Sequence, residues 1–289
     1  RSLVGIGKDD QPLDMDARPI VVGETFRRIA GKIALTRDKE ALSGWLKPAQ
    51  VAVGVKAGAE VIVHSLRQWW ERNQDNTNYV SLKMDYANAF NEAEPEAFLS
   101  TARRRMPGAA KMAYWCYGRD VALVYHGRVL KSSRGQQGCP LMMPMFCAMK
   151  KEMRDRVDGI ADVDFSADFA DDGVLGGDVD KVLKVLEGEI AIGPEYGVRN
   201  NFSKMVLYPL AGERFSGELD GFRRLGVKID FSCNVKFMQV PIVGDAAFIK
   251  EWADAKMGII KNVLEGVKGL SSRHVAFYLL KGVGDACRV

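Results

Sequence analysis

Two adjacent aspartates inside an apolar stretch constrain this chain more than any other feature of its sequence. The stretch DFSADFADDGVLGGD, residues 164–178, holds five acidic residues in fifteen positions, and Asp171 and Asp172 are neighbours among phenylalanine, alanine, valine and leucine. A solvated acidic loop would not alternate its charges with apolar side chains in this way. The alternation predicts two strands joined by a tight turn that presents the paired carboxylates.

Patterning elsewhere predicts alternating strands and helices. Strands are expected at 18–23 and 79–85 and in a hairpin over 120–133, with its turn near His126 and Gly127. Apolar residues recur at helical spacing in segments that cover residues 24–36, 58–73, 96–106, 139–157, 179–198 and 247–270. The helix over 139–157 is expected to be interrupted or kinked near Pro144. This order predicts an α+β domain that ends in a small helical appendage.

Charge is unevenly distributed along the chain. Residues 18–47 hold seven basic and three acidic residues, and residues 103–134 hold eight basic residues against Asp120. Residues 152–180 reverse this balance, with ten acidic and two basic residues. Any one of these blocks is typical of a solvated surface. Two basic blocks around an acidic centre indicate a polyanion held around a metal-binding site.

Cysteine content and hydropathy bear on the compartment. The five cysteines are odd in number and show no CxxC spacing, which favours reduced thiols in an intracellular compartment over a disulfide framework or a zinc site. No run approaches eighteen apolar residues, so no transmembrane helix or membrane partner is expected. The first residues, RSLVGIGKDD, include neither a start methionine nor a signal-peptide core, so we expect a domain cut from a longer chain.

A third carboxylate is needed to build a metal site around the paired aspartates. Asp85 ends the apolar strand YVSLKMD and is the best candidate, because pairing of this strand with the acidic hairpin would bring Asp85 to Asp171 and Asp172. Clustered carboxylates without a compensating base among the local residues are costly unless a cation neutralises them. Hard divalent cations prefer such oxygen ligands, and two Mg²⁺ ions could support phosphoryl transfer there.

Five segments occur in an order and spacing that resemble the reverse transcriptase palm, particularly the type in non-LTR retrotransposons and group II introns. They are DYANAF (85–90), RGQQGCPL (134–141), FADDG (169–173), GVRNNFSK (197–204) and RLGVKI (224–229). The resemblance covers residues 18 to about 229.

A polymerase of this type implies an α+β right-hand fold with fingers, an antiparallel palm sheet flanked by helices, and a partial helical thumb. The corresponding ranges would be 1–78 for the fingers, 79–245 for the palm with a fingers insertion around 100–135, and 246–289 for the start of the thumb.

The resemblance also implies a catalytic and metal-binding set. Asp85, Asp171 and Asp172 would be the metal ligands for two Mg²⁺ ions, with Mn²⁺ as an alternative, and Tyr86 would add its backbone carbonyl. Phe90 matches the aromatic residue that lies under the sugar and excludes a 2′-hydroxyl. Without the motif, Phe90 would be interpreted as a core aromatic residue at a helix start.

Further residues match positions that bind the nucleotide. Gln137 and Gly138 lie in the segment that supports the template base and incoming nucleotide. Lys204 matches a lysine near the triphosphate that could donate a proton to pyrophosphate. Basic positions that grip the triphosphate are matched by Arg18 and by one of Arg27, Arg28 or Lys32. RLGV, residues 224–227, resembles the hairpin that grips the primer end.

The chain departs from the family pattern at three places. Asn91 occupies a position that is often aspartate, and Phe169 occupies one that is often tyrosine. The segment PLMMPMF has one residue more than the usual pattern, which affects the placement of the helix after Pro140. None of these departures removes an expected metal ligand.

The resulting hypothesis is an RNA-directed DNA polymerase domain of a retroelement, which extends a DNA or RNA primer on an RNA template with dNTPs. An RNA-dependent RNA polymerase is an alternative, but it typically has a polar residue where this chain has Phe90. A palm-type nucleotide cyclase fits poorly, because GGDVD (176–180) follows the acidic hairpin instead of forming its turn. A catalytically inactive or domesticated relic that only binds nucleic acid is the non-enzymatic alternative.

Overall fold

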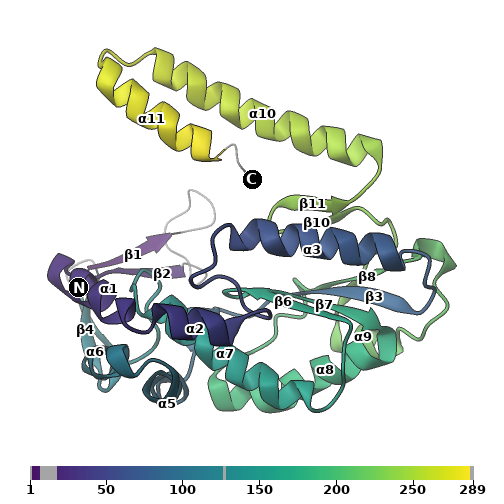
Figure 1. Ribbon diagram of the computed structural model, residues 1–289, viewed down its shortest axis with the longest axis horizontal. Coiled ribbons are helices and arrows are strands. Elements are labelled where there is room, and N and C mark those ends of the chain that lie inside the picture. The colour runs from purple at the N-terminus through teal and green to yellow at the C-terminus, as the bar shows by residue number, and fades with distance from the viewer. Residues whose placement is uncertain (1, 7–17, 126–127, 287–289) are drawn as a thin grey trace.

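A five-stranded sheet organises the molecule, in a computed structural model that describes residues 2–6, 18–125 and 128–286 (Figure 1). The strand order is β6-β7-β3-β8-β9. The strands are β6 (Phe165–Phe169), β7 (Asp172–Asp178), β3 (Tyr79–Met84), β8 (Val206–Pro209) and β9 (Lys228–Ile229). All neighbours are antiparallel except β8 and β9, which are parallel. The expected antiparallel sheet is therefore present, with one parallel pair at its edge.

Helices cover both faces of this sheet. The helix α3 (Gly58–Asn73) lies over one face, and α7 (Met142–Asp158) and α8 (Val179–Ile192) lie under the other (Figure 1). Because side chains alternate along a strand, neighbouring residues of β7 enter different cores. Val174 packs in the cluster around α3, whereas Leu175 packs in the larger cluster around α7 and α8.

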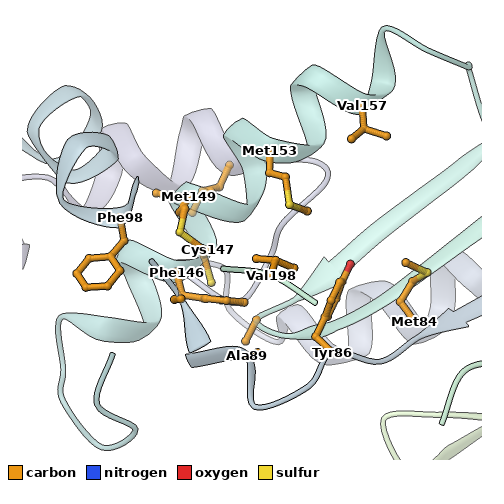
Figure 2. Packing of buried hydrophobic residues seen from close by; sticks show 14 of the residues in the cluster. Met84, Tyr86, Ala89, Phe98, Phe146, Cys147, Met149, Met153, Val157 and Val198 are labelled. Carbon is orange, nitrogen blue, oxygen red and sulfur yellow. The ribbon is translucent and has the colours of Figure 1, made fainter. Parts of the chain in front are cut away.

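The helix α7 corrects the expected kink at Pro144. It begins at Met142, so Pro144 lies in the first turn, where a backbone amide has no intrahelical partner. The proline therefore costs no hydrogen bond, and the helix continues without interruption to Asp158. Its inner face is buried along its whole length, and Figure 2 shows Phe146, Met149 and Met153 directed into this core.

A second sheet of four strands lies beside the first, in the order β2-β1-β4-β5. Its strands are β2 (Arg18–Val22), β1 (Ser2–Ile6), β4 (Val121–Tyr125) and β5 (Arg128–Ser132). The hairpin over 120–133 is confirmed by the β4–β5 pairing, while its turn at 126–127 lies outside the described residues.

The other helices that precede α7 are only partly those expected from the pattern. They are α1 (Thr25–Thr36), α2 (Lys39–Leu46), the single turn α4 (Ala89–Glu92), α5 (Pro95–Arg105) and α6 (Pro107–Tyr117). The sequence analysis misses α2 and α6. The start of α6 is stabilised by buried Asp38, whose carboxylate accepts hydrogen bonds from the amides of Gly108 and Ala109.

The apolar stripe of α1 faces outward. Phe26, Ile29 and Ile33 are exposed, whereas Arg27 and Gly31 are the buried residues of this helix. The period of the pattern thus predicts the helix correctly but does not identify its buried face.

The chain ends in a hairpin of strands followed by two helices that extend away from the body (Figure 1). These elements are β10 (Val235–Phe237), β11 (Val240–Val243), α10 (Ala246–Lys268) and α11 (Arg273–Ala286). Shorter helical segments precede them: η1 (Gly193–Tyr196), η2 (Gly212–Arg214) and α9 (Asp220–Leu225). No helix in the described part of the chain combines the length and apolar character that crossing a bilayer requires.

Candidate active site

The acidic turn between β6 and β7 has the expected geometry. Phe169 pairs with Asp172, so the turn consists of Ala170 and Asp171 alone. Ala170 has a φ of 55°, a left-handed conformation that costs a non-glycine residue about 1 kcal/mol. Buried Gln50 stabilises it: its amide oxygen accepts from the Ala170 amide at 3.0 Å, and its Nε2 donates to the Ala170 carbonyl at 3.2 Å. Gln50 thus satisfies both backbone groups of the strained residue.

Asp85 is carried to the same end of the sheet by β3. This strand lies next to β7, and its last residue, Met84, pairs with Gly173, directly beside Asp172. The carbonyl of Asp85 accepts a hydrogen bond from the Asn201 amide at 2.9 Å, which anchors the chain where it leaves the strand. The strand register thus brings Asp85 to the same end of the sheet as Asp171 and Asp172, and their joint role as metal ligands stays a prediction.

The electrostatics of Asp172 reflect this clustering. Burial raises the pKa of its carboxyl, and the nearby charges of Asp171 and Asp85 raise it further. Lys83 and Lys150 act in the opposite direction. The expectation that no base among the local residues compensates the carboxylates is therefore wrong, because two lysines lie within electrostatic reach.

The donor set is suited to a hard divalent cation. The three carboxylates offer only oxygen atoms, the type of ligand that Mg²⁺ binds. Within residues 2–6, 18–125 and 128–286, however, no three acidic, histidine or cysteine side chains are gathered closely enough to form a ready metal site. The structure thus brings the three aspartates to one end of the sheet and leaves metal binding by them as a proposal.

Tyr86 follows Asp85, and its side chain lies in the core. Figure 2 shows the ring pointing inward near Met84 and Val198. The phenol donates to Glu189 at 3.0 Å, and burial together with the Glu189 charge raises the pKa of Tyr86 well above its usual value. The backbone bridge between Tyr86 and Asn200 uses the Asp85 carbonyl and the Ala87 amide, not the Tyr86 carbonyl. Only the backbone of Tyr86 could therefore contact a metal.

A small polar pocket joins four of the expected site residues. Tyr86, Phe90, Gln137 and Asp171 all line it, although they come from three separate segments of the chain. The Phe90 ring packs against buried Phe146 with their centroids 4.8 Å apart, so its other surface remains available to the pocket. Phe90 is thus both a core aromatic residue and a pocket residue, which combines the two interpretations of its position.

The segment around Gln137 is placed by backbone contacts. The Gln137 carbonyl accepts from the Val21 amide of β2 at 2.9 Å, and Asn91, one of the departures from the family pattern, donates to the Gly135 carbonyl at 3.2 Å. A Cβ on Gly135 would overlap the carbonyl oxygen of Phe90. Gly138 has a φ of 99°, a conformation that favours glycine. These contacts explain why the segment is rich in glycine.

Of the expected basic residues, Arg28, Lys32 and Lys204 are not among those that line the pocket. Lys204 is exposed in a turn next to Asn201, and the hydrogen bond from Asn201 to the Asp85 carbonyl fixes this turn near the carboxylates. Arg28 and Lys32 are exposed on α1, and Arg18 belongs to β2.

Arg27 is placed differently from the other basic residues of α1. It is buried, with its guanidinium 5.7 Å from the Tyr117 ring centroid and 6.0 Å from that of Trp115. This contact leaves Arg28 and Lys32 as the accessible candidates on α1.

The expected primer-gripping hairpin is not at residues 224–227. Arg224 and Leu225 end the helix α9, and Gly226 stops it in a left-handed conformation with a φ of 80°. The hairpin that follows is formed instead by β10 and β11, residues 235–243. The RLGV motif therefore corresponds to a helix end that leads into β9.

Three residues near the turn were missed from the sequence, namely Gln50, Lys150 and Gly173. Lys150 is completely buried and bonded to Asp168, and a Cβ on Gly173 would lie 2.5 Å from the Asp168 Oδ1 atom. One signal was available: Lys150 and Arg154 interrupt the apolar face of α7 at a spacing of one helical turn. No comparable signal marks Gln50, which lies 120 residues from Ala170.

Comparison with known proteins bears on the fold. No protein-family model and no curated protein matches the chain. Telomerase from Candida tropicalis, in its apo form, superposes with a TM-score of 0.54 at 11% identity, over 74% of this chain and 39% of that chain. Telomerase from Candida albicans, in complex with a TWJ fragment of telomeric RNA, superposes with a TM-score of 0.51 at 12% identity, over 74% of this chain and 36% of that chain.

Telomerase is a reverse transcriptase, and the likeness shows a reverse-transcriptase-like α+β fold for the present chain. The chain spans less than two-fifths of the length of these two telomerase chains.

Proposed function

We propose that this chain is the polymerase domain of an RNA-directed DNA polymerase. The observation that carries the proposal is the convergence of Asp85, Asp171 and Asp172 at one end of the sheet, next to a pocket lined by Phe90 and Gln137. Three carboxylates at one end of the sheet, beside a pocket that Phe90 helps to line, are suited to the triphosphate and the sugar of a nucleotide.

The chemistry is nucleotidyl transfer from a dNTP to a primer end. Two Mg²⁺ ions, or Mn²⁺ in their place, would be held by Asp85, Asp171 and Asp172 together with the Tyr86 carbonyl. Such ions would lower the pKa of the attacking hydroxyl and stabilise negative charge on the leaving oxygen. The primer 3′-hydroxyl would release its proton to water, its oxygen would form a bond to the α-phosphorus, and the bond from that phosphorus to the pyrophosphate oxygen would break. Lys204 would protonate the departing pyrophosphate, while Arg18 and either Arg28 or Lys32 bind its phosphates.

The side chains of the pocket would select the nucleotide. The Phe90 ring, held from behind by Phe146, would pack against C2′ and leave no room for a 2′-hydroxyl. Gln137 and Gly138 would support the base pair between template and incoming nucleotide, where the missing side chain of Gly138 allows close approach. Discrimination against ribonucleotides would then arise from shape alone.

The finer assignment follows from the motifs. The five segments from Asp85 to Ile229 favour a retroelement enzyme of the non-LTR or group II intron type. Residues 1–78 and about 100–135 would form the fingers, 79–245 the palm and 246–289 the start of the thumb. RNA is the proposed template, as one neighbour of this fold is a telomerase solved with an RNA fragment.

Primer extension tests the proposal directly. An RNA template annealed to a DNA primer is incubated with Mg²⁺ and either dNTPs or NTPs, using the wild type, Phe90→Ala and Phe165→Ala. Phe165 is a matched control, because it is also half-buried and packs on an aromatic neighbour, Trp69. The centroids of the two rings are 5.6 Å apart. The wild type should extend with dNTPs only, and Phe90→Ala should increase NTP incorporation about tenfold or more, whereas Phe165→Ala should not.

Other results would redirect the interpretation. NTP incorporation by the wild type would replace the proposal with an RNA-dependent RNA polymerase. RNA binding without any extension, in this chain and in a version lengthened at its C-terminus, would support a binding-only relic.

A further inference from the structure

Four charged side chains are buried together under the acidic turn. Lys150 and Arg154 come from α7, Asp168 from β6 and Glu189 from α8, and each of these side chains is at most 5% exposed. Burial of a charge is costly unless it is paired. Stability alone therefore does not explain a cluster of two cations and two anions in the core. Its position beneath the acidic turn points to a role in holding that turn.

Lys150 is the member that contacts the acidic turn. Its ammonium lies 2.9 Å from the Asp168 Oδ1 atom and 3.5 Å from the carbonyl oxygens of both Ala170 and Asp171. It also lies 4.4 Å from the centroid of the Tyr86 ring. One ammonium group therefore touches the β6–β7 turn, which carries Asp171, and the segment after β3, which follows Asp85.

Arg154 occupies a different position in the cluster. Its Nη2 atom is 2.7 Å from Glu189 Oε1 and 3.8 Å from Asp168 Oδ1, and none of its nitrogens has a well-aligned hydrogen bond. None of its recorded contacts reaches the backbone of residues 170–172 within the described chain. The Arg154–Glu189 pair is consequently a natural internal control for the Lys150–Asp168 pair.

The packing around Lys150 leaves little freedom. A Cβ on Gly173 would lie 2.5 Å from the Asp168 Oδ1 atom and 3.4 Å from the Lys150 ammonium, so only glycine fits between the ion pair and β3. Asp168 is held in turn through its backbone, which bonds to Ala49 and Val51. Because Asp168 is fixed, the Lys150 ammonium bonded to it is fixed as well, and its contacts with the Ala170 and Asp171 carbonyls restrain the turn.

We propose that Lys150 is a positioning residue that holds the Asp171–Asp172 turn and the Asp85–Tyr86 segment in the relative placement that divalent-cation binding requires. The inference rests on the proposed function, because it gives the carboxylates their metal-binding role. Its positive charge also offsets part of the mutual repulsion of three carboxylates before a cation arrives. Lys150 itself touches neither substrate nor the reacting atoms.

The decisive variant is the double substitution Lys150→Met with Asp168→Asn. It removes one positive and one negative charge, so the net charge under the turn is unchanged and an altered cation affinity reports on geometry. Replacing both members of a buried ion pair is far better tolerated than removing one. The matched control is Arg154→Met with Glu189→Gln, which is also neutral overall and leaves Lys150 in place. Because the Tyr86 phenol donates to Glu189, glutamine is chosen there to keep a side-chain oxygen that accepts this hydrogen bond.

Two readouts separate positioning from general stability. Mn²⁺ binding is measured by electron paramagnetic resonance on the protein without nucleic acid, and single-nucleotide insertion is measured on a saturating primer–template. The Lys150/Asp168 variant should lose about tenfold in Mn²⁺ affinity and about 100-fold in insertion rate, with unchanged primer–template affinity. The control variant should stay within about threefold of the wild type in both.

The outcomes distinguish the two proposals. Normal Mn²⁺ affinity in the Lys150/Asp168 variant, equal losses in both variants, or no Mn²⁺ binding by the wild type would each overturn the role of Lys150. A wild type that binds Mn²⁺ but inserts no nucleotide, both as this chain and lengthened at its C-terminus, would refute the polymerase, while a selective loss of Mn²⁺ affinity would still support Lys150. If thermal unfolding shows that the first variant is not folded, Lys150→Gln with Asp168→Asn, which keeps a hydrogen-bonding pair, takes its place.

Discussion

The acidic and the basic sides of the candidate site are held in opposite ways. Asp171 lies in a turn whose backbone is bonded from below by Gln50 and Lys150. Arg28, Lys32 and Lys204 are exposed, and none forms an ion pair with an acidic side chain of the described residues.

The difference between the two sides has a physical origin. Carboxylates repel one another and must be placed by the scaffold, whereas long cationic side chains can be ordered by the triphosphate itself at the cost of side-chain entropy. Substitutions on the acidic side should therefore affect the rate, and those on the basic side should affect the nucleotide concentration that is required.

The largest effect is expected on the acidic side, at Asp171. Asp171→Asn removes a charged oxygen ligand while conserving shape, and nucleotide insertion should fall by about 10³-fold or more. Primer–template affinity, measured by fluorescence anisotropy, should stay within about threefold. Asp180→Asn, at an exposed position near the start of α8, is the control and should leave both quantities unchanged. An equal collapse of binding and insertion would refute the metal-site role.

A smaller but still large effect is expected at Gly135, which packs against the backbone of Phe90. A Cβ there would overlap the Phe90 carbonyl, and a backbone atom cannot move aside as a flexible side chain can. Gly135→Ala should lower the free energy of unfolding by about 2–4 kcal/mol, measured by urea denaturation, and relax the selection of dNTPs over NTPs. Gly44→Ala, where nothing lies within 4 Å of the added carbon, should do neither. Unchanged selectivity in a folded Gly135 variant would argue against Phe90 as the sugar gate.

Moderate effects are expected from the exposed basic residues. Alanine at whichever of Arg28 and Lys32 contacts phosphate should raise the KM for dNTP by about tenfold, because one charge-assisted hydrogen bond is lost. Lys204→Ala is set apart from these two variants, because it removes the proposed proton donor and should lower kcat. Steady-state insertion kinetics measure both effects. The control is Lys184→Ala, at an exposed position of α8. The comparison would break if the Arg28 or Lys32 variant lowered kcat as strongly as Asp171→Asn does, because the basic residues would then be part of the fixed scaffold.

The smallest effect is expected at Glu152, whose carboxylate contacts side chains of α5. Burial tends to raise its pKa, but hydrogen bonds from Arg104, Thr101 and Arg105 outweigh burial and lower the pKa of this carboxyl. A lowered pKa contributes stability above the ordinary value of the unfolded chain, and this contribution is lost as the pH falls through the folded-state value. Glu152→Gln should therefore cost about 1 kcal/mol at pH 7 and less near pH 3. Denaturation at both pH values measures this, and a cost that is independent of pH would contradict it.

The sequence predicts the acidic turn and the Asp85 strand well, because period-two alternation and adjacent acids leave few other structures open. It does not predict which face of α1 is buried, since Arg27 takes the core position through contacts with aromatic rings more than 85 residues away. It also predicts a kink at Pro144 that is absent, because the helix begins at Met142 and a proline in the first turn of a helix is tolerated.

The support beneath the turn is harder to foresee than the turn itself. A lysine in an amphipathic helix is usually a surface residue, and only the fold shows that Lys150 faces Asp168. The same holds for Gln50, whose partner is remote in sequence. Local pattern thus identifies the residues that would perform the chemistry, whereas the residues that place them emerge from tertiary packing.

The bond between Gln50 and Ala170 has a consequence for sequence divergence. The amide offers one donor and one acceptor to a single backbone residue, with both groups at the end of a two-carbon stem. Glutamate has the reach but not the donor, asparagine has the groups but not the reach, and methionine has neither group. In homologous chains that keep an alanine with positive φ in this turn, position 50 should therefore accept almost no substitution, even where the surrounding loop has drifted beyond alignment.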